Sequence, residues 1–337
     1  MRLILINILI ITGFLGISYF FFLLRPVASG AEVKQFTINS GRGFREIAAD
    51  LRESSLIRSE RAAEIYALVF GLAHRLKPGN YFLDSGLSAP KILKILADGP
   101  QDIAAVINEG MSLRDIDEVL GAKGILPAGA LANFNFIDLK KDYEFLNSAK
   151  GLEGYLFPDT YRFLPESDRA LVIRKFLDNF ERKAWPLLKK CQASSARCHD
   201  LTADEVLILA SLIEKEVPDS EDRKIVAGIL LKRLEIGMAL QVDATLSYIK
   251  CGGRFFFCES PGVERKDLIL ASGYNTYRYP GLPPAPISNP GQDALSAVLN
   301  AQTSPYLYYL SNPKTKKTIF SRTLEEHNEN RAKYLGL

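Results

Sequence analysis

The feature that most constrains this chain is an uncharged, mostly apolar run of 22 residues near its start, residues 3–24. As a helix, the run would be about 33 Å long, which is about the thickness of the hydrocarbon core of a bilayer. A cleaved signal peptide is the alternative, because Val27–Ala31 contains small residues, but the apolar part of such a peptide is usually shorter, roughly 7–15 residues. We therefore expect residues 1–25 to be a transmembrane anchor and residues 26–32 to be a linker.

The charged residues argue against two classes of function. The chain has 42 basic and 39 acidic residues, for a net charge of +3, and this balance does not indicate a nucleic-acid partner. It has only three histidines, which argues against a histidine-rich metal site.

The four cysteines form two local pairs, Cys191 with Cys198 and Cys251 with Cys258, each separated by seven positions. This spacing favours two disulfides in an oxidising compartment. One zinc ion held by four thiolates is the alternative, although the ligands of such sites are usually closer together in the sequence. The sequence leaves all three disulfide pairings open.

Residues 33–100 have the pattern of a small α+β module. Alternation and helical periodicity predict strand, helix, helix, strand and helix, at Lys34–Asn39, Phe44–Leu51, Ser59–Phe70, Tyr81–Leu83 and Ser88–Leu96. The first four elements resemble a LysM-like module. LysM modules bind polymers that contain N-acetylglucosamine, so the resemblance implies contact with a glycan.

The rest of the chain is predicted to continue as α+β structure. Ala104–Ile116 repeats the strand–turn–helix pattern of Phe36–Ile47, so residues 101–150 are interpreted as a second small module or connector. Residues 151–337 are interpreted as a larger catalytic domain that begins with an ordered loop rich in aromatic residues, Gly and Pro. An amphipathic helix is expected at Arg169–Leu188.

The helix predicted at residues 202–217 has the clearest chemical potential. Thr202 and Glu205 form a capping-box pattern at its start. Glu214 lies in its last turn, where partial burial and the negative end of the helix dipole would both disfavour the carboxylate. A protonated Glu is what a general acid for glycoside cleavage requires. Glu216 fits these arguments equally well.

Two later segments carry candidate ligand-binding groups. A helix capped by Ser220 is expected, followed by Gln241, Asp243 and Thr245, which would share one face of an extended backbone. Beyond them, Tyr274–Tyr277 precedes loops rich in Pro and Gly, and aromatic side chains there could stack on sugar rings.

Together these segments resemble the endolytic murein transglycosylase family, also called MltG or YceG-like. The resemblance covers most of residues 104–337 and rests on several ordered phrases: LEGYLFPDTY (152–161), ASLIEKE (210–216), a run from Arg223 to Tyr248, YNTY (274–277), GLPP (281–284) and NPG (289–291).

The resemblance implies a YceG-like catalytic domain in which Glu214 is the acid/base. It would first protonate the glycosidic oxygen between N-acetylmuramic acid and N-acetylglucosamine, and then accept the proton of the muramoyl C6 hydroxyl. That hydroxyl would attack C1 and leave a 1,6-anhydro end without metal, cofactor or water. The candidate substrate-binding residues are Gln241, Asp243, Thr245, Tyr248, Tyr274, Asn275, Thr276, Tyr277, Glu153 and Tyr155.

The expected location is the inner membrane, with a single span and the catalytic domain in the periplasm. The expected substrate is the nascent peptidoglycan strand, and membrane proteins of glycan synthesis are expected partners by analogy. Two alternatives stay open: a glycoside hydrolase that uses Glu214 with Asp243, and a non-catalytic, membrane-tethered glycan-binding protein.

Overall fold

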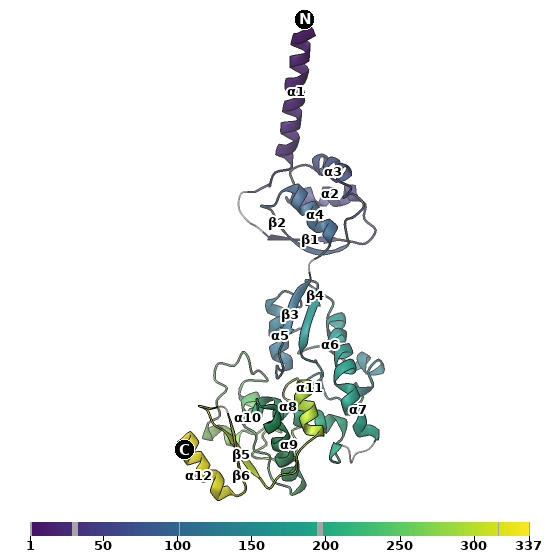
Figure 1. Ribbon diagram of the computed structural model, residues 1–337. Coiled ribbons are helices and arrows are strands. Elements are labelled where there is room, and N and C mark those ends of the chain that lie inside the picture. Colours follow the sequence, from purple (N-terminus) through teal and green to yellow (C-terminus); the bar gives the residue numbers. More distant parts are fainter. Residues whose placement is uncertain (1, 29–32, 101, 194–197, 316, 337) are drawn as a thin grey trace. The chain divides into compact units, whose positions relative to one another are not determined.

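The computed structural model describes residues 2–28, 33–100, 102–193, 198–315 and 317–336, without the side chains at 2–6, 8, 9, 33, 192 and 193. These residues form two compact units (Figure 1). The first contains residues 1–103 and 164–166, and the second contains residues 104–163 and 167–337. The boundary expected between residues 150 and 151 therefore falls inside the second unit.

The first unit contains two antiparallel strands and the helices that cover them. Its elements are α1 (Arg2–Leu23), β1 (Val33–Ile38), α2 (Phe44–Glu53), α3 (Glu60–Val69), β2 (Gly79–Asp84) and α4 (Ala89–Asp98). β1 pairs with β2 so that Phe36 lies opposite Tyr81, and both side chains are buried. The predicted strand–helix–helix–strand order after residue 32 is confirmed, because alternation in the strands and helical spacing between them place the apolar residues in one core.

The predicted membrane span coincides with α1. Among the residues whose side chains are described, no helix combines the length and the apolar character needed to cross a membrane. The predicted span includes positions 3–6, 8 and 9, whose side chains lie outside that set. Residues 29–32 of the predicted linker also lie outside the described residues.

The second unit is mixed α+β and contains two small sheets. Its strands are β3 (Ile103–Ile107), which pairs with β4 (Asp159–Phe163), and β5 (Tyr308–Ser311), which pairs antiparallel with β6 (Thr318–Ser321). Its helices are α5 (Leu113–Ala122), α6 (Arg169–Lys183), α7 (Trp185–Ala193), α8 (Ala203–Glu216), α9 (Ser220–Glu235), α10 (Asp243–Lys250), α11 (Gln292–Leu299) and α12 (Leu324–Leu335). Short 3₁₀ turns lie at Ile137–Lys141, Glu144–Leu146 and Arg265–Ile269.

Helix α8 is the centre of this unit. It contacts α9, α10 and α11, and eight consecutive residues, Val206–Ile213, are buried (Figure 1). A helix that is buried on all sides provides a fixed frame for the side chains at its end.

Two local predictions in this unit are wrong. The helix expected over 169–188 is divided into α6 and α7, because Pro186 has no N–H with which to continue the helical hydrogen bonds. The N-cap of α9 is Asp219 instead of Ser220. The Asp219 carboxylate accepts the N–H groups of Glu221 and Asp222 at 3.0 and 3.1 Å.

Candidate active site

The N-terminus of α8 is fixed by the predicted capping box. Thr202 Oγ1 accepts the Glu205 N–H at 3.3 Å, and Glu205 Oε2 accepts the Thr202 N–H at 2.8 Å. Both bonds satisfy backbone donors that would otherwise lack a partner in the first turn. The cap and the buried body of the helix hold Glu214 in the last turn of α8.

The Glu214 carboxylate is buried and has a partner on each oxygen. Only 4% of its side chain is exposed. Arg223 Nη2 donates to Oε1 at 2.7 Å, and the Gly291 N–H donates to Oε2 at 2.9 Å. Because a carboxylate oxygen has two lone pairs, each oxygen retains one for a further partner.

Arg223 is itself held in place by three partners. Besides Glu214, its Nη1 donates to Asp293 Oδ2 at 3.0 Å, and its Nε donates to the Val217 carbonyl at 2.7 Å. The guanidinium therefore joins the end of α8 to α9 and to the start of α11. A planar guanidinium can bind several acceptors in fixed directions, which a lysine ammonium cannot do.

This ion pair adds to the surroundings that the sequence predicted for Glu214. Burial and the helix dipole were expected to favour its protonated form. The structure adds a buried guanidinium and a backbone N–H, which both donate to the side chain.

Two glycines allow other groups to approach Glu214. Gly110, with φ +74°, lies so close that a Cβ there would be 3.4 Å from Glu214 Cγ. A Cβ on Gly291 would lie 1.8 Å from Glu109 Oε1, so a side chain at that position would displace the Glu109 carboxyl group. Burial, together with the negative charge of Glu214, raises the pKa of Glu109. The turn at 109–110 is therefore part of the site.

Glu153 is a structural carboxyl in this arrangement. It accepts the Leu113 N–H at 2.8 Å, the Asn289 side-chain amide at 3.2 Å and the Tyr248 hydroxyl at 3.2 Å. Burial raises its pKa to about 8. Asn289 precedes the Pro290–Gly291 pair, so Glu153 helps to fix the loop that donates to Glu214.

Glu216 fixes the other side of the helix end. Its oxygens accept the Ala244 N–H at 3.1 Å and the Tyr309 hydroxyl at 3.3 Å. Burial raises its pKa to about 7. Glu216 therefore connects α8 to the N-terminus of α10 and to β5, and its bonds differ from those of Glu214.

The extended arrangement predicted for residues 241–245 is wrong, because α10 begins at Asp243. Gln241 and Asp243 are exposed, and Asp243 accepts a hydrogen bond from the Tyr277 hydroxyl. Thr245 is fully buried and donates to the Val242 carbonyl at 2.7 Å. Of the three residues, only Gln241 and Asp243 can reach a ligand from solvent.

The YNTY segment is likewise divided between structural and accessible side chains. Asn275 and Thr276 are buried, and their side chains bond to backbone groups, so they are not available to a sugar. Tyr274 and Tyr277 are half-buried, and the Tyr274 ring lies 5.2 Å from the ring of Tyr248.

Tyr155 is also buried, and its hydroxyl donates to Asp204 Oδ1 at 2.6 Å. Its hydroxyl is therefore engaged with α8, although Tyr155 and Glu153 both line a hollow of the second unit. The candidate substrate-binding residues that remain are Gln241, Asp243, Tyr248, Tyr274, Tyr277, Glu153 and Tyr155.

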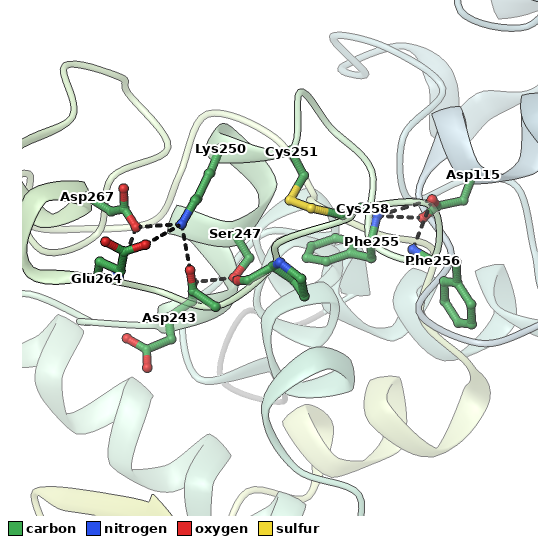
Figure 2. The surroundings of a disulfide bond; sticks show 12 residues. Asp115, Asp243, Ser247, Lys250, Cys251, Phe255, Phe256, Cys258, Glu264 and Asp267 are labelled. Atoms are coloured by element: carbon green, nitrogen blue, oxygen red, sulfur yellow. Dashed lines mark hydrogen bonds and ion pairs between the residues drawn. A yellow bond between two sulfur atoms is a disulfide. The ribbon is translucent and has the colours of Figure 1, made fainter.

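A disulfide-closed loop follows α10 (Figure 2). Cys251 and Cys258 are bonded, as are Cys191 and Cys198, which agrees with the local pairs and contradicts the zinc alternative. The buried Asp115 carboxylate accepts the N–H groups of two residues in this loop, Phe255 and Phe256, each at 3.1 Å. Lys215, the neighbour of Glu214 on α8, places its ammonium 4.2 Å from the centre of the Phe255 ring.

Two hollows lie elsewhere on the second unit. One, of about 230 Å³, is lined by residues that include Glu153, Tyr155 and Pro284. The other, of about 420 Å³, is lined by residues that include Arg114 and Arg254. Glu214 is in neither lining.

Sequence reasoning did not assign functions to Arg223, Glu109 and Gly291. Arg223 and Gly291 lie in phrases that carry the family resemblance, and Glu109 lies in the repeated strand–turn–helix pattern. These positions could be suspected from the sequence, but the contact between Gly291 and Glu214 joins segments that are 77 positions apart.

The fold and site define the class of this protein: an α+β protein with a buried glutamate held at the end of a central helix by an arginine and a loop N–H. The model of the YceG-like family matches residues 36–333, and the chain belongs to this family.

Its relatives include the endolytic murein transglycosylases of Bacillus subtilis and Streptococcus pneumoniae. The chain is 31% identical to the Bacillus protein over 93% of its own length and 88% of the relative. It is 27% identical to the Streptococcus protein over 96% of its own length and 62% of the relative. A crystal structure of a yceG-like protein from Listeria monocytogenes matches with a TM-score of 0.57 and 30% identity, over 89% of this chain and all of the other.

Proposed function

We propose that this chain is an endolytic peptidoglycan lytic transglycosylase that cleaves the bond from N-acetylmuramic acid to N-acetylglucosamine and leaves 1,6-anhydro ends. The observation that carries the proposal is the buried Glu214 carboxylate, held by Arg223 and by the Gly291 N–H. The names of the Bacillus and Streptococcus relatives support the same reaction.

In this reaction Glu214 first donates a proton to the glycosidic oxygen, which leaves as the C4 hydroxyl of N-acetylglucosamine, and its carboxylate accepts the proton of the muramoyl C6 hydroxyl. The C6 oxygen then forms a bond with C1 as the bond from C1 to the leaving oxygen breaks. Because the attacking hydroxyl belongs to the same sugar, holding the sugar in position makes the attack intramolecular. The negative charge of Glu214 also stabilises the positive charge that develops at C1 in the transition state.

The first unit is proposed to bind the glycan in the manner of a LysM-like module. The strand–helix–helix–strand order of residues 33–84 supports this role. We also propose that residues 3–24 anchor the chain in the inner membrane, with both units outside the cytoplasm. The uncharged apolar sequence of this run and the two disulfides support that location.

An anchored enzyme of this kind would meet strands close to the membrane. It would therefore terminate or trim nascent strands, and membrane proteins of glycan synthesis would be its partners.

The test is digestion of purified sacculi by the wild-type protein and by Glu214→Gln, with Glu181→Gln as a control for an exposed carboxylate. We expect Glu214→Gln to keep its circular dichroism spectrum and lose most of its turnover, and Glu181→Gln to match the wild type. Normal turnover by the folded Glu214→Gln protein would refute the proposal.

A further inference from the structure

Glu109 is a second carboxylate next to Glu214 that the proposed reaction has not used. It lies in the turn between β3 and α5 and is exposed. Among the hydrogen bonds and ion pairs between described residues, none involves its carboxylate. A partly buried carboxylate that is still reached by solvent and has no partner among the described residues can meet a substrate.

Glu109 and Glu214 meet at the same residue. Gly291 donates its N–H to Glu214 Oε2 at 2.9 Å, and the position of its missing Cβ lies 1.8 Å from Glu109 Oε1. The two carboxyl groups therefore lie next to the same glycine, and glycosidic bonds are commonly cleaved by a pair of carboxyl groups.

The surroundings of the two groups differ. Both oxygens of Glu214 accept hydrogen bonds, one from the Arg223 guanidinium and one from the Gly291 N–H, whereas no described residue donates to the Glu109 carboxylate. Burial and the negative charges of Glu214 and Asp293 raise the pKa of Glu109. The positive charge of Arg223 lowers it, but the net shift is upward. Two carboxyl groups that share a site are commonly divided into one acid and one base in this way.

We propose that Glu109 is a second catalytic residue, the acid that protonates the glycosidic oxygen while Glu214 accepts the proton of the C6 hydroxyl. This assignment rests on the proposed transglycosylase function. It replaces a single carboxyl group that performs both steps with two groups that perform one step each.

The proton and electron balance is complete without a co-reactant. The Glu109 proton moves to the leaving oxygen, which departs as the C4 hydroxyl of N-acetylglucosamine with the electron pair of the C1–O bond. The C6 oxygen supplies the pair for the new bond to C1, and its proton moves to Glu214. Transfer of that proton from Glu214 to Glu109, directly or through water, restores the starting state.

The test uses two substrates that differ in their need for an acid. The first is native glycan, and the second is a glycan oligosaccharide whose terminal N-acetylmuramic acid carries an aryl leaving group. A phenolate leaves without protonation, so an acid contributes little to its departure. The proteins are full-length wild type, Glu109→Gln, Glu109→Asp, Glu214→Gln and the control Glu181→Gln.

We expect Glu109→Gln to lower kcat on native glycan about 10²–10⁴-fold, the usual contribution of a general acid, with little change in KM. On the aryl substrate it should retain most of the wild-type rate, whereas Glu214→Gln should be slow on both. The fall in wild-type activity as the pH rises, caused by loss of the acid's proton, should be absent in Glu109→Gln. Glu109→Asp should restore part of the rate and that pH dependence.

Two results would overturn the assignment. One is a wild-type rate of Glu109→Gln on native glycan. The other is an equal loss on both substrates with the pH profile unchanged, which would indicate a structural role. If Glu214→Gln is inactive while Glu109→Gln is normal, only this assignment fails, whereas normal turnover by Glu214→Gln removes the proposed function itself.

Discussion

Replacing Arg223 with Ala should cost the second unit much of its stability. The substitution removes the partner of a Glu214 side chain that is only 4% exposed, and it leaves the Val217 carbonyl without its donor. Breaking a buried ion pair by removing one partner costs about 3–5 kcal/mol, because the remaining charge stays buried without compensation. For a unit of this size, each kcal/mol lowers the melting temperature by roughly 2–4 °C, so we expect a fall of about 6–20 °C.

The matched control is Arg174→Ala, which removes an arginine from an ion pair with Asp142 whose side chains are 37% and 35% exposed. Exposed pairs contribute about 0–1 kcal/mol, so its effect should be small. Arg223→Lys should be intermediate, because an ammonium cannot replace all three directed bonds of the guanidinium.

The assay is differential scanning calorimetry of the full chain, following the transition of the second unit, with urea unfolding as a second measure. If Arg223→Ala and Arg174→Ala shift the melting temperature equally, the inference that Glu214 depends on a buried counter-charge is refuted.

Two further predictions concern stability. Because burial raises the pKa of Glu153 to about 8, its stabilising effect is complete below its unfolded value near 4.5 and is lost as the pH rises through about 8. With about 1.4 kcal/mol for each tenfold change in proton affinity, the free energy of unfolding falls by at most about 5 kcal/mol over this range. Glu153→Gln should flatten this pH dependence in urea unfolding. An unchanged dependence of stability on pH in Glu153→Gln would contradict the prediction. Replacing both cysteines of either disulfide with serine should lower the free energy of unfolding by about 2.5 kcal/mol. The two losses should be equal, because Cys191–Cys198 and Cys251–Cys258 both span seven positions and close loops of equal length. Clearly unequal losses in urea unfolding would show that local strain or packing, and not loop closure, determines their contribution.

Local sequence signals predicted most of the secondary structure correctly. The Thr202–Glu205 capping box marks the start of α8, and its apolar residues mark a buried helix. The alternation predicted at Gln241–Thr245 failed because polar residues two apart fit a strand face and a helix start equally well. In the folded chain, the Ala244 N–H in the first turn of α10 donates a hydrogen bond to the Glu216 side chain on α8.

The candidate site was less predictable than the fold. The family resemblance identified Glu214, but its hydrogen-bond partners Arg223 and Gly291 come from other elements. Burial of Thr245, Asn275 and Thr276 could not be read from their polar side chains, because a buried polar group needs partners that only the folded chain supplies. Contacts of this kind between distant segments leave no periodic pattern in the sequence.

The central claim is that C1 is attacked by the sugar's own C6 hydroxyl and not by water. The most direct measurement is digestion of purified glycan strands in water enriched in oxygen-18, with mass spectrometry of the new ends. The account predicts anhydro ends that lack one water relative to reducing ends and contain no heavy oxygen. Reducing ends that carry one heavy oxygen would contradict it and would identify the protein as a hydrolase.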